Sequence, residues 1–400
     1  MSVPKLRFKE FDANWSLSSL GKMTTYFKGY AFKSESYKDS GIRVIRVSDL
    51  GRESIKTDND SIYIDANNAS AYENWIIKKD DIIITTVGSK PHLVDSAVGR
   101  PIYVKNNNEG LLNQNLLVLR PMDKTVDSYF IYAQLLDKKY LTHIELIQRG
   151  NANQSNITVK DLQDFETYIT SKKEQTKIAS FLSAVDEKIS QLTQKHELLS
   201  QYKQGMMQKL FSQEIRFKAD DGSEFGEWEN ISVKEIFDVT RGQVLAVSNT
   251  VSVADTDYKY PVFSSQTKQK GLMGFYKKYL FEDALTWTTD GANAGDVNFR
   301  KGKFYCTNVC GVLLSKKGYA NLCIAEILNK VTHKYVSYVG NPKLMNNVMS
   351  EIPITIPSNL EEQTKIANFL SSIDQKIEVV AQQIEQAKQW KKGLLQQMFV

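Results

Sequence analysis

The chain has 400 residues, 42% of them hydrophobic and 24% charged, and this ordinary globular composition allows two or three domains with cores of their own. No stretch approaches the roughly 18 uncharged apolar residues of a membrane span, and the first residues lack the apolar segment of a secretion signal. The net charge of +5 permits a polyanionic partner without requiring one. Three cysteines are too few for a disulfide framework, so we expect a cytoplasmic protein that does not bind a membrane.

The first part of the chain combines strand-like and helix-like segments. It opens with Arg-Phe-Lys and a tryptophan in LRFKEFDANW, residues 6–15. The runs IIITTV (82–87) and LLVLR (116–120) are rich in β-branched residues, which is typical of strands. DSYFIYAQLLDKKYL, residues 127–141, has helical spacing with Asp127 as its N-terminal cap. These patterns predict an α+β domain over residues 1–172.

Residues 174–211 predict a long helix with a coiled-coil seam. Apolar residues recur at steps of four and three over five heptads, which keeps one narrow apolar face toward one partner helix. The seam begins with Ile178, Leu182, Val185, Ile189 and Leu192, and His196 and Lys203 are its polar members.

The second half of the chain repeats the first. Residues 362–399 align with 174–211 without a gap, with 19 identities in 38 positions. Upstream of the second helix, IRFKADDGSEFGEW (215–228) corresponds to LRFKEFDANW (6–15). Two further pairs of segments match. DDIIITTVGS, from residue 80, resembles EDALTWTTDGA, from residue 282, and GNANQSNITV, from residue 150, resembles GNPKLMNNVM, from residue 340. We therefore divide the chain into domain 1 (1–172), helix 1 (173–211), domain 2 (212–360) and helix 2 (361–400).

The obvious partner for one long helix is the other copy, whose seam contains Ile366, Leu370, Ile373, Ile377 and Val380. A parallel pair would stack Lys203 on Lys391 in the core, so we expect antiparallel helices with each ammonium group reaching water. At 1.5 Å per residue the pair would form a spacer about 57 Å long. A heptad helix that only makes a homodimer is the alternative, but a homodimer needs no second copy in one chain.

At these residues the sequence resembles the specificity subunit of type I restriction-modification enzymes. The shared features are Arg-Phe followed by Trp at the start of each domain, Gly-Asn near its end, and EQTKIA at the start of each long helix. The resemblance implies two target recognition domains that each read half of a split, asymmetric sequence in double-stranded DNA. It also implies that the antiparallel helices fix the gap and bind two methyltransferase subunits, to which endonuclease and translocase subunits are added.

Polar loops supply the candidate DNA-binding residues, because Lys and Arg bind phosphates while Arg, Asn and Gln read base edges. A solvated polar loop is the alternative for each of them. In domain 1 the candidates are Arg43, Arg46, Lys90, His92, Arg100, Gln148, Arg149, Asn153, Gln154 and Ser155. In domain 2 they are Arg241, Gln243, Ser265, Gln266, Lys268, Lys270, Asn293, Arg300, Lys343 and Asn346. The segments QRGNANQSN and FSSQTKQKG concentrate the most polar groups.

Motifs for catalysis are missing from the sequence. It has no Gly-rich nucleotide-binding loop, and its single Asn-Pro, at residues 341–342, continues with Lys343, unlike an adenine methyltransferase motif. Cys306, Cys310, Cys323 and His333 match no compact zinc spacing, so we expect the cysteines to be buried structural residues. We predict a subunit without catalysis or cofactor; the alternatives are a coiled-coil scaffold that binds proteins and an enzyme with an unrecognised site.

Overall fold

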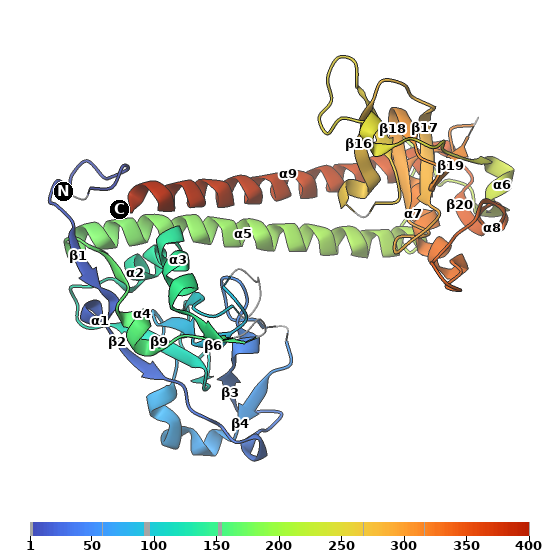
Figure 1. The fold of residues 1–400 in the computed structure, drawn as a ribbon. Coiled ribbons are helices and arrows are strands. Elements are labelled where there is room, and N and C mark those ends of the chain that lie inside the picture. The colour runs from blue at the N-terminus through green and yellow to red at the C-terminus, as the bar shows by residue number, and fades with distance from the viewer. Residues whose placement is uncertain are drawn as a thin grey trace. The chain divides into compact units, whose positions relative to one another are not determined.

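The computed structural model describes residues 3–57, 59–91, 97–150, 154–266, 268–315 and 317–399. The chain forms two compact units (Figure 1): unit 1 comprises Met1–Thr193 and Gln382–Val400, and unit 2 comprises Gln194–Ala381. The two long helices are α5 (Lys172–Phe211), which begins in unit 1 and ends in unit 2, and α9 (Leu360–Met398), which runs from unit 2 to unit 1. In the part of the chain that is described, no helix is long and apolar enough to cross a membrane.

Unit 1 is built around a four-stranded antiparallel sheet of order β2-β9-β5-β7. Its central strand β5 carries the run of isoleucines, and Ile82, Ile83 and Ile84 are fully buried, as expected for a strand that is covered on both faces. The strands of this sheet are β2 (Thr24–Lys28), β5 (Ile82–Thr85), β7 (Pro101–Tyr103) and β9 (Leu116–Pro121).

Smaller sheets and helices complete unit 1. The pair β1 and β12 is antiparallel, β3 lies between β4 and β8, and β11 lies between β10 and β6. These strands are β1 (Ser16–Ser19), β3 (Ile42–Ile45), β4 (Ile62–Ile64), β6 (Val87–Gly88), β8 (Leu111–Leu112), β10 (Arg149–Gly150), β11 (Ser155–Asn156) and β12 (Glu166–Ile169). The short helices are α1 (Leu20–Met23), α2 (Ser128–Gln134), α3 (Lys138–Ile147) and α4 (Val159–Gln163), with 3₁₀ turns at Ser34–Ser36, Val47–Asp49 and Ala66–Trp75.

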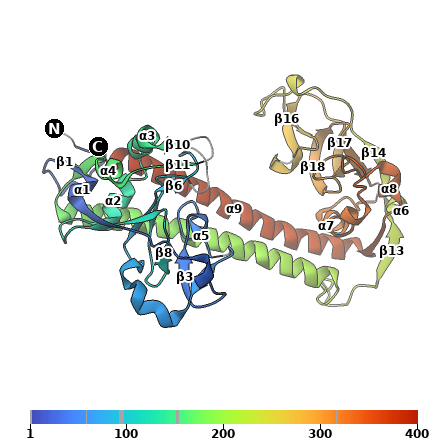
Figure 2. The ribbon, with the colours of Figure 1, turned by 60° about the horizontal axis from the view of Figure 1, so that its bottom comes forward.

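Unit 2 contains a six-stranded sheet of order β14-β19-β17-β18-β15-β16 and the separate pair β13 and β20. Figure 2 shows helix α7 beside this sheet and beside the first part of α9, and Ile324 shares a core with Ile366 and Leu370. The strands are β13 (Trp228–Ser232), β14 (Asp238–Arg241), β15 (Tyr260–Phe263), β16 (Leu272–Tyr276), β17 (Phe281–Thr288), β18 (Val297–Cys306), β19 (Cys310–Leu314) and β20 (Pro353–Pro357). The helices are α6 (Val233–Ile236), α7 (Leu322–Val331) and α8 (Asn346–Glu351), with 3₁₀ turns at Val247–Asn249, Lys268–Gly271 and Thr332–Tyr335.

The two units share one construction, as the internal repeat predicts. Strands β2, β9, β5 and β7 of unit 1 correspond to β14, β19, β17 and β18 of unit 2, and in each unit one further strand pairs in parallel, β3 with β8 and β15 with β18. In both units a glycine follows the first strand of the main sheet, Gly29 after β2 and Gly242 after β14, because another part of the backbone lies very close there. An added Cβ would lie 1.8 Å from the carbonyl oxygen of Asn113 at Gly29, and 2.0 Å from that of Cys306 at Gly242.

The repeated Arg-Phe-Lys sequence ties the start of each domain to a long helix. Arg7 forms a two-pronged ion pair with Glu174 of α5, with N–O distances of 2.7 and 2.8 Å. Arg216 does the same with Glu362 of α9, at 3.0 and 2.8 Å. Both glutamates are 1% exposed, so each pair is a buried anchor at the same place of the repeat.

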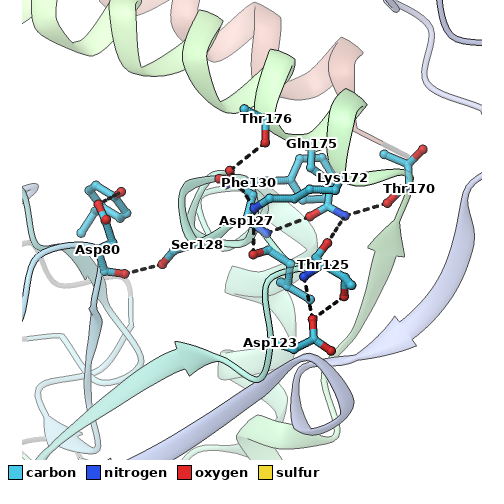
Figure 3. Close-up of polar contacts among 12 residues, drawn as sticks. Asp80, Asp123, Thr125, Asp127, Ser128, Phe130, Thr170, Lys172, Gln175 and Thr176 are labelled. Atoms are coloured by element: carbon cyan, nitrogen blue, oxygen red, sulfur yellow. Dashed lines mark hydrogen bonds and ion pairs between the residues drawn. The ribbon is translucent and has the colours of Figure 1, made fainter.

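The glutamine that follows each of these glutamates, Gln175 or Gln363, joins the long helix to the residue that caps a domain helix. In unit 1 the Gln175 amide oxygen accepts a hydrogen bond from the backbone of Asp127, which caps α2, and its nitrogen donates to the carbonyl oxygen of Thr170 (Figure 3). In unit 2, Gln363 accepts from Asn321, which caps α7. The prediction that Asp127 caps a helix is confirmed, and Asn321 caps the matching helix of unit 2.

The seam residues of the long helices lie on their buried faces. Nine of the ten that the sequence identifies are at most 8% exposed, and Ile377 is partly buried. In unit 1, Ile178 and Leu182 of α5 share a core with Leu394 and Met398 of α9. In unit 2, Leu210 of α5 shares a core with Ile366 and Leu370 of α9.

The two seam lysines end on carboxylates, whereas the sequence led us to expect that they reach water. Lys391 of α9 lies 2.5 Å from Asp186 of α5, and the two side chains are 10% and 12% exposed. Lys203 of α5 lies 2.8 Å from Asp374 of α9 and 3.1 Å from Glu326 of α7. Burial alone would lower the pKa of Lys203, but these two carboxylates outweigh it and raise the pKa. A buried ammonium group needs such partners, which a heptad pattern does not reveal.

Candidate nucleic-acid interface

In unit 1 the polar segment around residue 150 forms a small hairpin on the loop that follows β5. Strand β10 pairs with β11, with Arg149 opposite Asn156 and Gly150 opposite Ser155. Strand β11 pairs in turn with β6, which directly follows β5, and places Ser155 opposite Gly88. Two segments that lie more than 60 residues apart in the sequence therefore form one surface.

Unit 2 has a hairpin at the matching place, over residues 337–343. Ser337 and Lys343 exchange two backbone hydrogen bonds of 2.8 and 2.9 Å, and Lys343 pairs with Asp290 in the loop that follows β17. The loop with Asn293 and the segment with Lys343 and Asn346, which supply separate DNA-binding candidates in the sequence, thus meet as their counterparts do in unit 1.

The candidates at the unit 1 hairpin divide into held and open side chains. The Ser155 hydroxyl is buried and donates to the Gln148 amide at 2.6 Å, so these two residues shape the hairpin. Arg149 is 63% exposed and pairs with Asp161 at 2.9 Å, and Gln154 is exposed. Lys90 is partly buried near the same strand β6. The candidates His92 and Asn153 lie outside the described residues.

The candidates at the unit 2 hairpin form a more open group. Arg241 at the end of β14 is exposed and donates to the amide oxygen of Asn346 at 3.4 Å, while the Asn346 nitrogen donates to the carbonyl oxygen of Thr240. The Lys343 side chain is 51% exposed, and its ammonium group lies 3.8 Å from Asp290. Gln243 is exposed and Asn293 is partly buried.

The remaining candidates of unit 1 are Arg43, Arg46 and Arg100. They contact other residues of unit 1 and stabilise its fold. Arg43 donates to the carbonyl oxygen of Lys56 at 2.7 Å, and Arg46 pairs with the buried Asp49 at 3.0 Å. Arg100 is partly buried, and its backbone donates to the Thr85 hydroxyl.

Arg300 is the candidate that the structure places deepest inside a unit. It is 9% exposed, lies over the ring of Phe263 at 3.7 Å, and donates to the Thr286 hydroxyl and to the carbonyl oxygen of Lys270. Burial lowers the pKa of Arg300 to about 10. Its guanidinium group therefore holds the loop that carries the candidates Ser265, Gln266, Lys268 and Lys270, of which Gln266 and Lys270 are exposed.

Sequence reasoning missed two surface features of unit 2. The first is the pair Tyr338 and Val339 at the tip of the hairpin, which are 69% and 92% exposed and directly precede Gly340 and Asn341. The second is a tyrosine and lysine cluster in which Lys303 lies 4.7 Å from the ring of Tyr279, itself 5.1 Å from the ring of Tyr260. The sequence YKKY at residues 276–279 was the available signal for it.

The cysteines and the charged cleft of unit 1, which could be considered for catalysis or metal binding, have structural roles. The three cysteines are buried in β18, β19 and α7, which confirms their predicted structural setting. Within the described ranges, no cluster of three or more His, Cys, Asp or Glu side chains is arranged to hold a metal ion. A cleft of about 960 Å³ in unit 1 is lined by charges that pair with one another, such as Arg120 with Asp81 and Lys172 with Asp127.

Sequence comparison places this chain among proteins with a named role. A sequence model of the family "Type I restriction modification DNA specificity domain" matches residues 13–201 and 226–389. A type I specificity subunit of Mycoplasma pneumoniae is 30% identical over 227 residues, which cover 55% of this chain and 79% of that protein. The specificity subunit of the type I restriction enzyme MjaX of Methanocaldococcus jannaschii is 26% identical over 341 residues, 79% of this chain and 76% of that one.

A solved structure has the same fold. The crystal structure of the S subunit of a type I restriction-modification system from M. genitalium superimposes with a TM-score of 0.70. The alignment covers 100% of this chain and 99% of that chain, at 19% sequence identity. The shared fold thus extends over both units and both long helices.

Proposed function

Because the chain belongs to the family of type I restriction modification DNA specificity domains, we propose that it reads a split, asymmetric DNA target on behalf of partner subunits. Each unit reads one half-site in double-stranded DNA. The two long helices bind two methyltransferase subunits, and endonuclease and translocase subunits complete the enzyme. The chain itself carries out no catalysis, and methylation and cleavage belong to the partners.

The observation that carries this proposal is the pair of matching hairpins with unlike side chains. Both pair with the loop after the central strand, β5 or β17. Arg149 and Gln154 are exposed at the first hairpin, whereas Tyr338, Val339 and Lys343 are exposed at the second. Two readers with one scaffold and different contact groups fit two different half-sites.

The proposed division of labour follows from the chemistry of the exposed groups. Arg149, Arg241 and Lys343 carry positive charge for phosphates, which supplies affinity without sequence information. Amide groups such as those of Gln154 and Gln243 can form paired hydrogen bonds with adenine. Held residues such as Gln148 and Arg300 orient the loops.

In this proposal the long helices form an antiparallel coiled coil whose length sets the gap between the half-sites. The packing of Ile178 near Met398 in unit 1, and of Leu210 near Ile366 in unit 2, supports this arrangement because early residues of one helix meet late residues of the other. The segments 1–172, 173–211, 212–360 and 361–400 are then recognition domain 1, spacer helix 1, recognition domain 2 and spacer helix 2.

The test is DNA binding by the chain assembled with its methyltransferase. The assembly should select one sequence from a pool of random duplexes, with an affinity that falls steeply as salt rises. A scaffold that binds only proteins would show no selection, and an enzyme in its own right would methylate or cleave DNA without partners. Either result would contradict the proposal.

A further inference from the structure

The hairpin at residues 337–343 of unit 2 presents two apolar side chains to solvent. Val339, at 92% exposed, is the most exposed large hydrophobic residue in the described part of the chain, and its neighbour Tyr338 is 69% exposed. Burial of these side chains against a partner would be favourable, by about 0.8 kcal/mol for each CH₂ group.

The base of the hairpin is firmly held, so the exposure of its tip is a fixed property of the fold. Besides the two bonds between Ser337 and Lys343, the Gly291 N–H donates to the carbonyl oxygen of Pro342 at 3.0 Å. The following residue, Leu344, is fully buried, and its carbonyl oxygen accepts a hydrogen bond from the Trp287 indole at 3.0 Å.

The turn itself is narrow and preset. Gly340 has a φ of +78°, which glycine adopts without strain, and Pro342 fixes the backbone on the return side. One isolated bridge, between Ser337 and Lys343, closes the hairpin, and chains paired in this way lie about 4.8 Å apart. A loop of this width fits the major groove of B-DNA, which is about 12 Å wide.

Basic residues lie on both sides of the tip along the chain. Lys334 precedes it and Lys343 follows it, and Arg241 contacts Asn346 just beyond the hairpin. Two carboxylates are also near: Asp296 lies 3.2 Å from the His333 ring and Asp290 lies 3.8 Å from Lys343. An apolar tip of two residues between cations is too small for a protein interface of about 800 Å² per partner, but it suits a groove lined by phosphates.

We propose that this hairpin enters the major groove of the half-site read by unit 2, where Val339 and Tyr338 recognise a thymine through its C5 methyl group. This inference rests on the proposed function and adds an element to it. The methyl group is the apolar feature by which thymine differs from cytosine in the major groove, and apolar side chains are the groups that contact it.

The test uses the full chain assembled with its methyltransferase and duplexes that carry its target, identified by sequencing methylated adenines. Each thymine of the half-site is replaced singly by uracil, which removes only the methyl group. At one position the wild-type assembly should lose about fourfold in affinity, the value of one buried methyl group. The variant Val339→Ser should bind the thymine and uracil duplexes equally.

A double variant and a matched control complete the experiment. Tyr338→Ser with Val339→Ser should weaken target binding by about tenfold. Its melting temperature should be unchanged, because the bonds that hold the hairpin base come from the backbone and Trp287. Val253→Ser, at a valine that is 74% exposed in another loop of unit 2, should bind as the wild type does.

Each remaining outcome has a definite meaning. Wild-type affinity and an unchanged uracil profile in the double variant would overturn the inference. Loss of methyltransferase binding with DNA affinity intact would also overturn it, since the tip would then be a protein contact. If the wild-type assembly itself bound random and target duplexes equally, the proposed function would fail, independently of the hairpin.

Discussion

Individual ion pairs decide how each unit is attached to a long helix. Burial alone would raise the pKa of Glu174, but hydrogen bonds from Arg7 and Thr170 outweigh it and hold the pKa below its usual value. The folded state therefore binds a proton less tightly than the unfolded state. This contribution to stability is complete above the unfolded pKa of about 4.3 and is lost as the pH falls through the folded pKa.

We predict that Glu174→Gln lowers the free energy of unfolding of unit 1 by about 3 kcal/mol at pH 7, because the substitution leaves the guanidinium of Arg7 buried without a charged partner. The difference from the wild type should narrow as the pH falls below about 4.3, where the unfolded state begins to bind a proton at Glu174, and should vanish only below the lowered pKa of the folded state. Urea unfolding across this pH range measures it. Glu187→Gln, at an exposed position of α5, should change stability by less than about 0.5 kcal/mol. Equal effects of both variants would contradict the anchoring role.

Exposed lysines of unit 2 at the hairpin and away from it should behave differently in DNA binding. Lys343→Ala removes one exposed charge at the hairpin, so the slope of log affinity against log salt should become shallower by about 0.9. Lys218→Ala, at a lysine 60% exposed and paired with Glu224 far along the chain from the hairpin, should leave the slope unchanged. Salt titrations of the assembled protein measure both slopes. An unchanged slope for Lys343→Ala would remove this residue from the phosphate contacts.

At the scale of elements, the long helices carry two matching polar contacts inside an apolar seam. Lys391 with Asp186 and Lys203 with Asp374 are the same pair of the repeat, since both members are displaced by 188 residues. In unit 1 the Tyr129 hydroxyl also donates to Asp186 at 2.5 Å, which links the helix pair to α2. Buried pairs of this kind cost more when one partner is removed than when both are replaced.

We therefore predict that Asp186→Leu and Lys391→Leu each destabilise unit 1 by about 3 kcal/mol, and that the double variant recovers much of this loss. Thermal unfolding of the four proteins gives the coupling energy. The exposed pair Lys177 with Glu10, both 51% exposed, is the control, and its coupling should be much weaker than that of the buried pair because water screens it. Additive effects at the buried pair would show that the contact does not bind the helices together.

The elements that depend on local pattern could be predicted from the sequence, and those that depend on distant partners could not. The heptad spacing of Ile178 and Leu182 indicates a buried helix face without any knowledge of the rest of the chain. The role of Lys391 depends on Asp186, 205 residues earlier, which the spacing does not reveal. Arg300 is indistinguishable in sequence from an exposed arginine, because its burial comes from Phe263 and Thr286 on other strands.

The same limit applies to the reading surfaces. The polar loops of each domain could be selected by composition. That they meet at a hairpin within each unit follows from the pairing of Ser155 with Gly88 in unit 1 and of Lys343 with Asp290 in unit 2. Tyr338 and Val339 were not among the predicted DNA-binding residues, because these were chosen for their polar side chains. Only the fold shows that they are exposed.

At the scale of the whole molecule, the chain contains one construction twice, with common anchors and different contact groups. The glutamate and glutamine at the start of each long helix are unchanged between the copies, whereas the hairpins share little beyond Gly-Asn. The anchors and the candidate DNA-binding hairpins have therefore diverged to different extents. In the proposed function, this separation lets each unit read a half-site of its own.

Exchange of one reader tests this claim most directly. Residues 230–350 are replaced by the corresponding residues of a relative with a different target, and the methylated adenines are sequenced in cells that contain the hybrid and its partner subunits. The account predicts that one half of the methylated sequence changes while the other half and the gap stay the same. A change in both halves, or in neither, would contradict it.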